Sequence, residues 1–311
     1  MKVRGKFPEA KPTPHHPDEV GPGALTLPAE RITEAVSGYR GSEYVSDDLL
    51  DLIDHTMQLV AKHAEKFAAQ AAAYDLPDEQ AKMRLDEGFH LLDADKLKID
   101  NEALQGVTTD ILALASFTDE ETLAAMRDYI DKLIADPQAL TTFIRFNVAR
   151  HEANVDEQLE ASGLSREAFY FLLYNLGVAV LPAYAAYLGK QVDDERWLNG
   201  TCPICGNRPA MAALVGDGGK RHLFCGTCNF VWTYPRLKCP YCGNKEHEKM
   251  MVLMPSDDSP YQLDACQACS RYVKTVDYRK ADAKRAVLLP VEDAATVYLD
   301  IMAGNEGFKR E

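Results

Sequence analysis

Apolar residues recur at steps of three and four along most of the first two-thirds of the chain, the period of an amphipathic helix. Leu49, Leu50, Ile53, Met57 and Val60 follow this pattern. Prolines and polar capping residues interrupt it at short intervals, so neighbouring helices should be antiparallel. The pattern predicts helices at about 47–73, 79–93, 104–114, 118–136, 138–161 and 165–190.

One predicted helix is apolar on every side. Residues 168–189 contain no charged side chain and are long enough to span a bilayer. However, Asn175, Pro182 and four tyrosines are spread along this segment, whereas the aromatic residues of membrane spans gather at the two interfaces. We therefore expect a buried helix at the centre of a helical domain, and no stable membrane insertion.

The helical period ends at Trp197–Gly200, where we place a hinge. Short runs rich in β-branched and aromatic residues follow, and a glycine-rich turn at 216–219 predicts a hairpin. Helical periodicity returns at about 291–302. The predicted strands are Met211–Val215, His222–Phe224, Phe230–Tyr234, Met250–Met254 and Tyr272–Tyr278.

The first 30 residues contain six prolines and predict an arm that lies on the surface or is disordered. His15 and His16 in this arm should be solvated. The first residues also show no apolar run or cleavage site, which predicts a cytoplasmic protein without a signal peptide. The predicted division is an arm at 1–30, a helical domain at 31–198, metal-binding modules at 199–280 and a C-terminal helix with a tail at 281–311.

The eight cysteines of the 311-residue chain all lie in the predicted β region and all form C-x-x-C pairs. Two intervening residues let both sulfurs of a pair face one side of a tight loop, as a tetrahedral metal site requires. Four pairs supply ligands for two closed four-thiolate sites. The predicted metal ligands are Cys202, Cys205, Cys225, Cys228, Cys239, Cys242, Cys266 and Cys269.

The cysteine region is a repeat of two units. The segment C-P-I-C-G-N at 202–207 matches C-P-Y-C-G-N at 239–244, and an aromatic β-prone run follows the second pair of each unit. Each unit resembles a rubredoxin-like or zinc-ribbon module. The repeat favours consecutive grouping of the pairs, although a cross-braced arrangement would alternate them. The predicted fold is α+β: an all-helical N-terminal domain, two tandem rubredoxin-like or zinc-ribbon modules with four cysteines each, and a short C-terminal helix.

The ligand set predicts two metal ions but does not distinguish iron from zinc, because both accept four thiolates. Disulfides are disfavoured in a chain with 46% hydrophobic residues and no secretory signal. Dithiol redox chemistry is disfavoured because no C-x-x-C motif begins a helix of a βαβ unit. The sequence contains no G-x-S-x-G, P-loop, G-x-G-x-x-G or H-E-x-x-H motif. Closed four-cysteine sites also leave no coordination position for catalysis, so we expect no enzyme.

Charge separates the cysteine region from the rest of the chain. The net charge is −14, but residues 197–280 hold 11 Lys/Arg and 7 Asp/Glu, a balance of +4 that leaves −18 elsewhere. The acidic body disfavours nucleic acid as a partner. It also suggests attraction to a basic export signal or a basic face of a client protein.

The combination of a helical N-terminal part with four C-x-x-C pairs resembles the formate dehydrogenase accessory protein FdhE family. The resemblance lies in Gly200–Gly206, Arg221–Trp232, Lys238–Cys242 and Cys266–Cys269, and near the end in Leu299–Asp300 and Glu306–Phe308. It implies a cytoplasmic assembly factor that is needed for active respiratory formate dehydrogenases. Such a factor would bind the catalytic subunit before export through the twin-arginine pathway, with metal-ligand roles for the eight cysteines.

The leading hypothesis is therefore a non-enzymatic maturation factor with the formate dehydrogenase catalytic subunit as its partner. A rubredoxin-like iron protein that exchanges electrons with the client is the first alternative. A zinc-ribbon nucleic-acid binder is the second.

Overall fold

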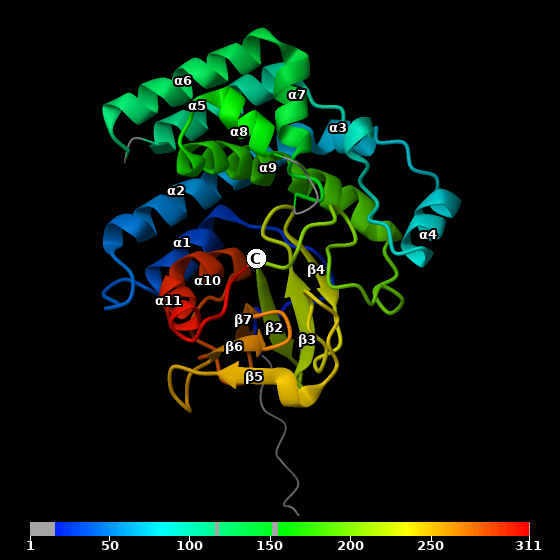
Figure 1. The fold of residues 1–311 in the computed structure, drawn as a ribbon, viewed down its shortest axis with the longest axis vertical. Helices are drawn as coiled ribbons and strands as arrows, with labels where there is room; N and C mark the ends of the chain where they lie inside the picture. Colours follow the sequence, from blue (N-terminus) through cyan, green and yellow to red (C-terminus); the bar gives the residue numbers. More distant parts are fainter. Residues whose placement is uncertain (1–15, 116–117, 151–154, 311) are drawn as a thin grey trace, which may run out of the picture.

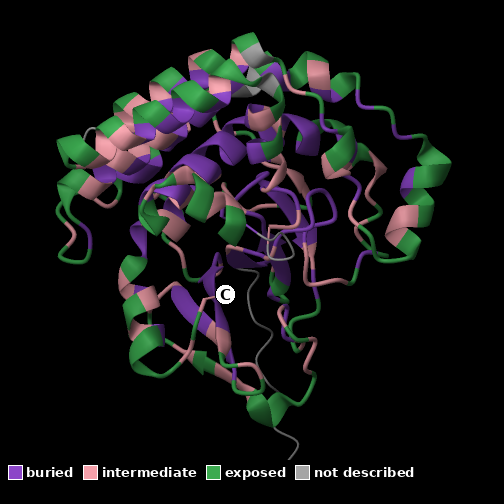
Figure 2. Cartoon of the chain, turned by 45° about the horizontal axis from the view of Figure 1, so that its top comes forward, coloured by how far each residue is buried: buried purple, intermediate pink, exposed green. Residues whose placement is uncertain are grey.

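The computed structural model describes residues 16–115, 118–150 and 155–310. Helices form a layer that covers one end of a β-sheet, and the two C-terminal helices lie beside the sheet (Figure 1). This is the α+β architecture that the sequence predicts. Buried segments gather where the helical layer meets the sheet, while the outer faces of the helices are exposed (Figure 2).

The helical layer is organised around α9 (Arg166–Leu188), which begins where Ser165 Oγ accepts a hydrogen bond from the amide of Ala168. With the turn that follows, Arg166–Gln191 is long and apolar enough to cross a membrane, but 67% of its most apolar window is buried inside the protein. Helix α9 is thus the buried central helix predicted from its composition. The other helices of this layer are α1 (Ala29–Ser37), α2 (Asp47–Ala64), α3 (Ala68–Ala72), α4 (Asp78–Asp86), α5 (Asn101–Leu114), α6 (Glu120–Ala135), α7 (Pro137–Arg145) and α8 (Asp156–Ser162).

The predicted 47–73 helix is divided into α2 and α3 by a 3-10 turn at Glu65–Phe67. Two other predicted helices are shorter in the structure than their periodicity indicated. Helix α4 stops at Asp86, and the predicted 138–161 helix is divided into α7 and α8. In both cases the residues after the helix form hydrogen bonds with the first cysteine loop. The amides of Leu91 and Leu92 donate to the carbonyls of Pro203 and Ile204, at 2.8 and 2.9 Å. The amide of Ala149 donates to the carbonyl of Cys205. Contact with the first cysteine loop therefore overrides helical propensity.

In the part of the chain that the structure describes, the sheet has seven strands in the order β1-β4-β3-β2-β7-β6-β5. All neighbouring strands are antiparallel except β2 and β7, which pair in parallel from Met211↔Lys274 to Leu214↔Asp277. This parallel pair joins the two repeat units edge to edge in one sheet. The strands are β1 (Gly23–Ala24), β2 (Met211–Val215), β3 (Lys220–Phe224), β4 (Phe230–Thr233), β5 (Met250–Leu253), β6 (Tyr261–Cys266) and β7 (Arg271–Asp277).

The described part of the N-terminal arm lies against the sheet. Strand β1 extends it by pairing with Phe230 and Val231 of β4. His16 is buried, with Nε2 3.1 Å from the carbonyl oxygen of Asp282 and its ring edge-on to Tyr278. The expectation of a solvated His16 is therefore wrong, and His15 lies outside the described residues.

The C-terminal segment forms two helices where the sequence predicts one: α10 (Leu289–Ala295) and α11 (Val297–Asn305). The break falls at Thr296, whose hydroxyl donates to the carbonyl of Glu292 at 2.6 Å. The Glu292 side chain is fully buried and accepts hydrogen bonds from Arg285, Tyr39 and Tyr261. This network connects α1, the sheet and α10, so the C-terminal helices are anchored to both layers.

Candidate metal centre

The structure brings the eight cysteines together in two groups of four. The first site contains Cys202, Cys205, Cys225 and Cys228, and the second contains Cys239, Cys242, Cys266 and Cys269. Within each site all four sulfurs lie within 4.8 Å of one another. This is the consecutive grouping favoured by the repeat, and the alternating arrangement is excluded.

The sulfur separations suit tetrahedral coordination. Nearest sulfurs are 3.5 Å apart in the first site and 3.8 Å apart in the second. Metal–sulfur bonds of about 2.3 Å at tetrahedral angles separate two ligands by about 3.8 Å. A disulfide requires about 2.05 Å, so the eight residues are free thiols placed to hold one ion at each site.

Each cysteine loop turns in the same way. Gly206, Asn229, Gly243 and Ser270 each follow the second cysteine of a pair, and all four have positive φ, between 55° and 75°. Glycine adopts this conformation without strain, whereas Asn229 and Ser270 are residues that the sequence pattern did not single out. Asparagine tolerates this left-handed conformation better than most residues. The sequence signal that could have revealed these two residues is their position, directly after the second cysteine of a C-x-x-C pair.

Backbone geometry prepares the sulfurs for negative charge. The amides of Tyr241 and Cys242 point at the sulfur of Cys239, and the amide of Cys228 points at Cys225. Such bonds orient and stabilise thiolate ligands. Burial raises the pKa of Cys202 and of Cys228 well above the ordinary thiol value. The metal-free first site therefore holds these two thiols protonated, and binding an ion displaces their protons.

The first site is enclosed by the helical layer. All four of its cysteines are 0% exposed. Besides the backbone bonds from Leu91, Leu92 and Ala149, the Asn207 side chain donates to the carbonyl of Asn147 at 2.6 Å. The hydroxyl of Tyr174 in α9 donates to the carbonyl of Gly226 at 3.1 Å. The helical layer thus holds both loops of this site.

The second site includes Cys266 at the end of β6 and is partly open. Cys239 and Cys266 are 1% exposed, but Cys242 is exposed and Cys269 is half-buried. Burial alone would raise the pKa of the Cys242 thiol, but hydrogen bonds with the amide of Asn244 and with the neighbouring sulfurs outweigh burial. The net effect is a pKa below the ordinary thiol value. The second site therefore presents one accessible thiol with increased thiolate character.

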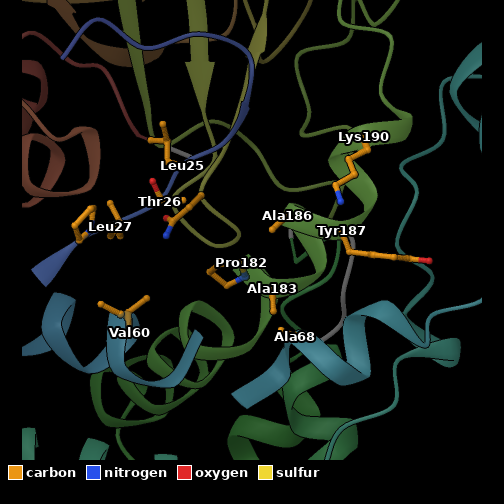
Figure 3. Close-up of a pocket in the computed structure, with 13 residues that line it drawn as sticks. Leu25, Thr26, Leu27, Val60, Ala68, Pro182, Ala183, Ala186, Tyr187 and Lys190 are labelled. Carbon is orange, nitrogen blue, oxygen red and sulfur yellow. The ribbon is translucent and has the colours of Figure 1, made fainter. Parts of the chain in front are cut away.

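A hollow of about 490 Å³ lies apart from both sites, between the N-terminal segment and α2, α3 and α9 (Figure 3). Its walls are largely apolar, from Leu25, Leu27, Val60, Pro182 and Ala183 among others. Among the described residues that line this hollow, the ionisable side chains are Tyr187 and Lys190. Within the part of the chain that the structure describes, its lining contains no carboxylate or histidine side chain.

Comparison with known proteins points to one family. The FdhE central domain matches residues 201–236, which contain the first cysteine site. The protein FdhE homolog of Aquifex aeolicus (strain VF5) is 30% identical over 151 residues, covering 47% of this chain and 51% of that protein. The homolog of Pseudomonas aeruginosa is 29% identical over 182 residues, covering 51% of this chain and 58% of that protein. The chain spans about half the length of the curated relatives that it matches.

The fold is also similar to a solved structure. The crystal structure of the FdhE protein from Pseudomonas aeruginosa aligns with a TM-score of 0.54 over 93% of this chain and 96% of that chain, at 18% sequence identity. This likeness supports the fold across both layers, beyond the segments matched by sequence. The predicted resemblance to the FdhE family is confirmed.

Proposed function

We propose that this protein, as a relative of FdhE, is a non-enzymatic assembly factor that binds the catalytic subunit of a formate dehydrogenase in the cytoplasm. The observation that carries the proposal is the pair of four-cysteine sites built on one sheet and attached to a helical layer, in a chain with this resemblance. Such sites are structural elements when all ligands come from the protein. The role is then that of a chaperone, with recognition rather than bond chemistry as its task.

We further propose that each site holds one metal ion through its four cysteine sulfurs. The fit of the sulfur separations to a tetrahedral ion supports this assignment for both sites. An iron or zinc ion would supply a rigid crosslink between two loops. The chain itself provides the enclosing backbone amides and excludes water from the first site.

The client would be recognised by the acidic body. The net charge of −14 favours a basic segment of the client and disfavours nucleic acid as a partner. Burial of α9 inside the helical layer supports a protein that does not insert stably in membranes. Helix α6 offers exposed acidic side chains, such as Asp128 and Asp131, for a test of this surface.

The test is an anaerobic affinity purification from the native organism, with mass spectrometry of the bound proteins and metal analysis of the same sample. Recovery of a formate dehydrogenase catalytic subunit is the expected result, and its recovery should decrease for Asp128→Lys combined with Asp131→Lys. A matched variant, Asp128→Asn with Asp131→Asn, removes the charges without reversing them and should lose less. Recovery of ribosomes or RNA polymerase without any formate dehydrogenase would overturn the proposal.

The accessible Cys242 favours a second candidate function, electron exchange with the client by an iron ion in the second site. A metal ion in the partly open second site would lie a short distance from a bound partner, as electron exchange requires. An ion in the enclosed first site would lie farther from any partner. An absorption spectrum distinguishes the candidates, because ferric four-thiolate iron is strongly coloured and zinc is colourless. A colourless, zinc-loaded protein that still binds its client would exclude electron exchange.

A further inference from the structure

A smaller, polar cavity lies between the two cysteine sites. Its volume is about 260 Å³. Gly226 and Thr227 of the second cysteine loop form one part of its wall, and Tyr241 of the third loop forms another. Three arginines of the described chain also line it: Arg150, which follows α7, Arg208, which follows the first loop, and Arg310 near the C-terminus. Neither the FdhE resemblance nor the proposed function assigns a role to this cavity.

Arg310 is neutralised by its surroundings. It forms an ion pair with Asp293, which also lies 3.0 Å from the buried ammonium group of Lys274. Asp300 lies 2.8 Å from Lys274 and 3.5 Å from Arg310. Two cations and two carboxylates thus balance on this side of the cavity. The pKa of Asp293 is lowered because the two cations outweigh the effect of its burial.

The other two arginines have no such balance. Among the described residues, neither Arg150 nor Arg208 forms an ion pair with a carboxylate. The Arg150 guanidinium lies over the ring of Tyr174 at 5.9 Å, and that of Arg208 lies over Tyr241 at 5.8 Å. Arg208 also donates one hydrogen bond to the carbonyl of Tyr241 at 3.1 Å. These cation–π contacts place each guanidinium beside a tyrosine ring and leave most of its five donors available.

Within the described residues, an excess of two positive charges therefore faces a cavity in a protein whose net charge is −14. Planar guanidinium groups bind oxyanions through paired hydrogen bonds. The cavity is smaller than the roughly 300–1,000 Å³ typical of sites for drug-sized ligands, so it suits a small group. Two excess charges match a phosphate group, which carries about two negative charges, better than a single carboxylate.

We propose that this cavity is an oxyanion site that binds the phosphate group of a small molecule, with Arg150 and Arg208 as its binding residues. Because Arg208 holds the carbonyl of Tyr241, an occupied cavity would also brace the third cysteine loop against the second. The proposal does not depend on the identity of the client or of the metal.

Isothermal titration calorimetry of the full-length, metal-loaded protein tests the proposal, with pyrophosphate as the main probe and inorganic phosphate as the second. Citrate at matched ionic strength provides the carboxylate probe. Saturable binding of pyrophosphate is expected, and Arg150→Gln should weaken it at least about tenfold, because a hydrogen-bonded charge pair is lost. Arg150→Lys keeps the charge but loses the fork, so it should give an intermediate affinity.

Arg166→Gln is the matched control, because Arg166 also lies over a tyrosine ring, that of Tyr170 at 5.8 Å, but away from the cavity. It should bind pyrophosphate as the unmodified protein does. Arg208→Gln should weaken binding as Arg150→Gln does, and if it unfolds the third loop, the Arg150 variants decide alone. Absence of saturable phosphate binding, unchanged affinity in Arg150→Gln, or tighter binding of citrate than of pyrophosphate would each overturn the proposal.

Discussion

The first cysteine site is enclosed by the helical layer, whereas the second has one sulfur open to solvent, although both come from the same repeat. Their loops share the left-handed residue after each pair and the backbone bond that closes the C-P-x-C-G-N turn, at 2.8 Å from Cys202 to Asn207 and 2.9 Å from Cys239 to Asn244. What differs is the packing around them. Identical local chemistry thus yields one site that fastens two layers of the protein and another that is partly open to solvent.

Loss of a ligand should separate the two sites most strongly. Cys205→Ser should lower the free energy of unfolding by on the order of 5 kcal/mol, because it removes a fully buried ligand at the contact between helices and sheet. Cys242→Ser should cost about 1–2 kcal/mol, since solvent already reaches that position. Urea unfolding followed by circular dichroism measures both. Equal losses would show that enclosure does not matter for the first site.

Chemical access should differ between the sites in the intact fold. In the metal-free protein, Cys242 should react with iodoacetamide first, and the four cysteines of the first site last, because each must await local opening. A colorimetric chelator should likewise release one ion at least about tenfold faster than the other. Peptide mass spectrometry identifies the modified residues. A single release phase, or early labelling of Cys202, would contradict the contrast.

The two loop glycines offer a smaller, closely matched test. Alanine at Gly206 or Gly243 would adopt left-handed φ, near 75° or 72°, at a cost of about 1–2 kcal/mol. At Gly206 the added methyl would also lie 2.7 Å from Nδ1 of His90, whereas at Gly243 its nearest neighbour is a Lys238 carbon at 3.8 Å. Gly206→Ala should therefore destabilise more than Gly243→Ala in thermal unfolding. A larger loss of stability in Gly243→Ala than in Gly206→Ala would indicate that the contact between His90 and the first cysteine loop is not close.

Acid should produce the smallest contrast. Burial lowers the pKa of His222 in the first unit below its ordinary value of about 6.5. Above pH 6.5 the His222 imidazole is neutral in both the folded and the unfolded chain, so the free energy of unfolding does not change with pH. Below pH 6.5 the unfolded chain binds the proton more readily than the folded protein. The free energy of unfolding therefore declines, by up to about 1.4 kcal/mol per pH unit. His222→Gln should reduce this slope in denaturant titrations from pH 7 to 5. His247→Gln, an exposed change in the second unit, is the control and should leave the slope unchanged.

Sequence patterns predicted those features that depend on local chemistry. The C-x-x-C spacing and the repeat indicated the grouping of the cysteines, and apolar runs identified most strands of the cysteine region. Strand β6 was missed although its apolar residues alternate with polar Gln262 and Asp264, which is a strand pattern. Asp264 accepts hydrogen bonds from Gln262 and Thr275 within the sheet. The two-residue strand β1 carries no pattern at all.

Features that depend on distant contacts were less accessible to sequence reasoning. The burial of one site and the exposure of the other follow from how the helical layer packs, and the two cysteine motifs do not encode that difference. Arg221 and Lys274 are charged residues in β-strands, yet both are about 1% exposed. Lys274 is matched by Asp293 and Asp300, which come from the C-terminal helices. Such pairing is visible only once the fold brings the partners together.

The parallel pairing of β2 with β7 has a consequence for synthesis of the chain on the ribosome. Strand β2 leaves the exit tunnel long before β7, so one side of its backbone must wait without a strand partner. Open strand edges are templates for aggregation. The nascent first unit therefore depends on shielding until residue 277 has emerged, and stalled or truncated chains that end before β7 should be the forms that quality-control proteases remove.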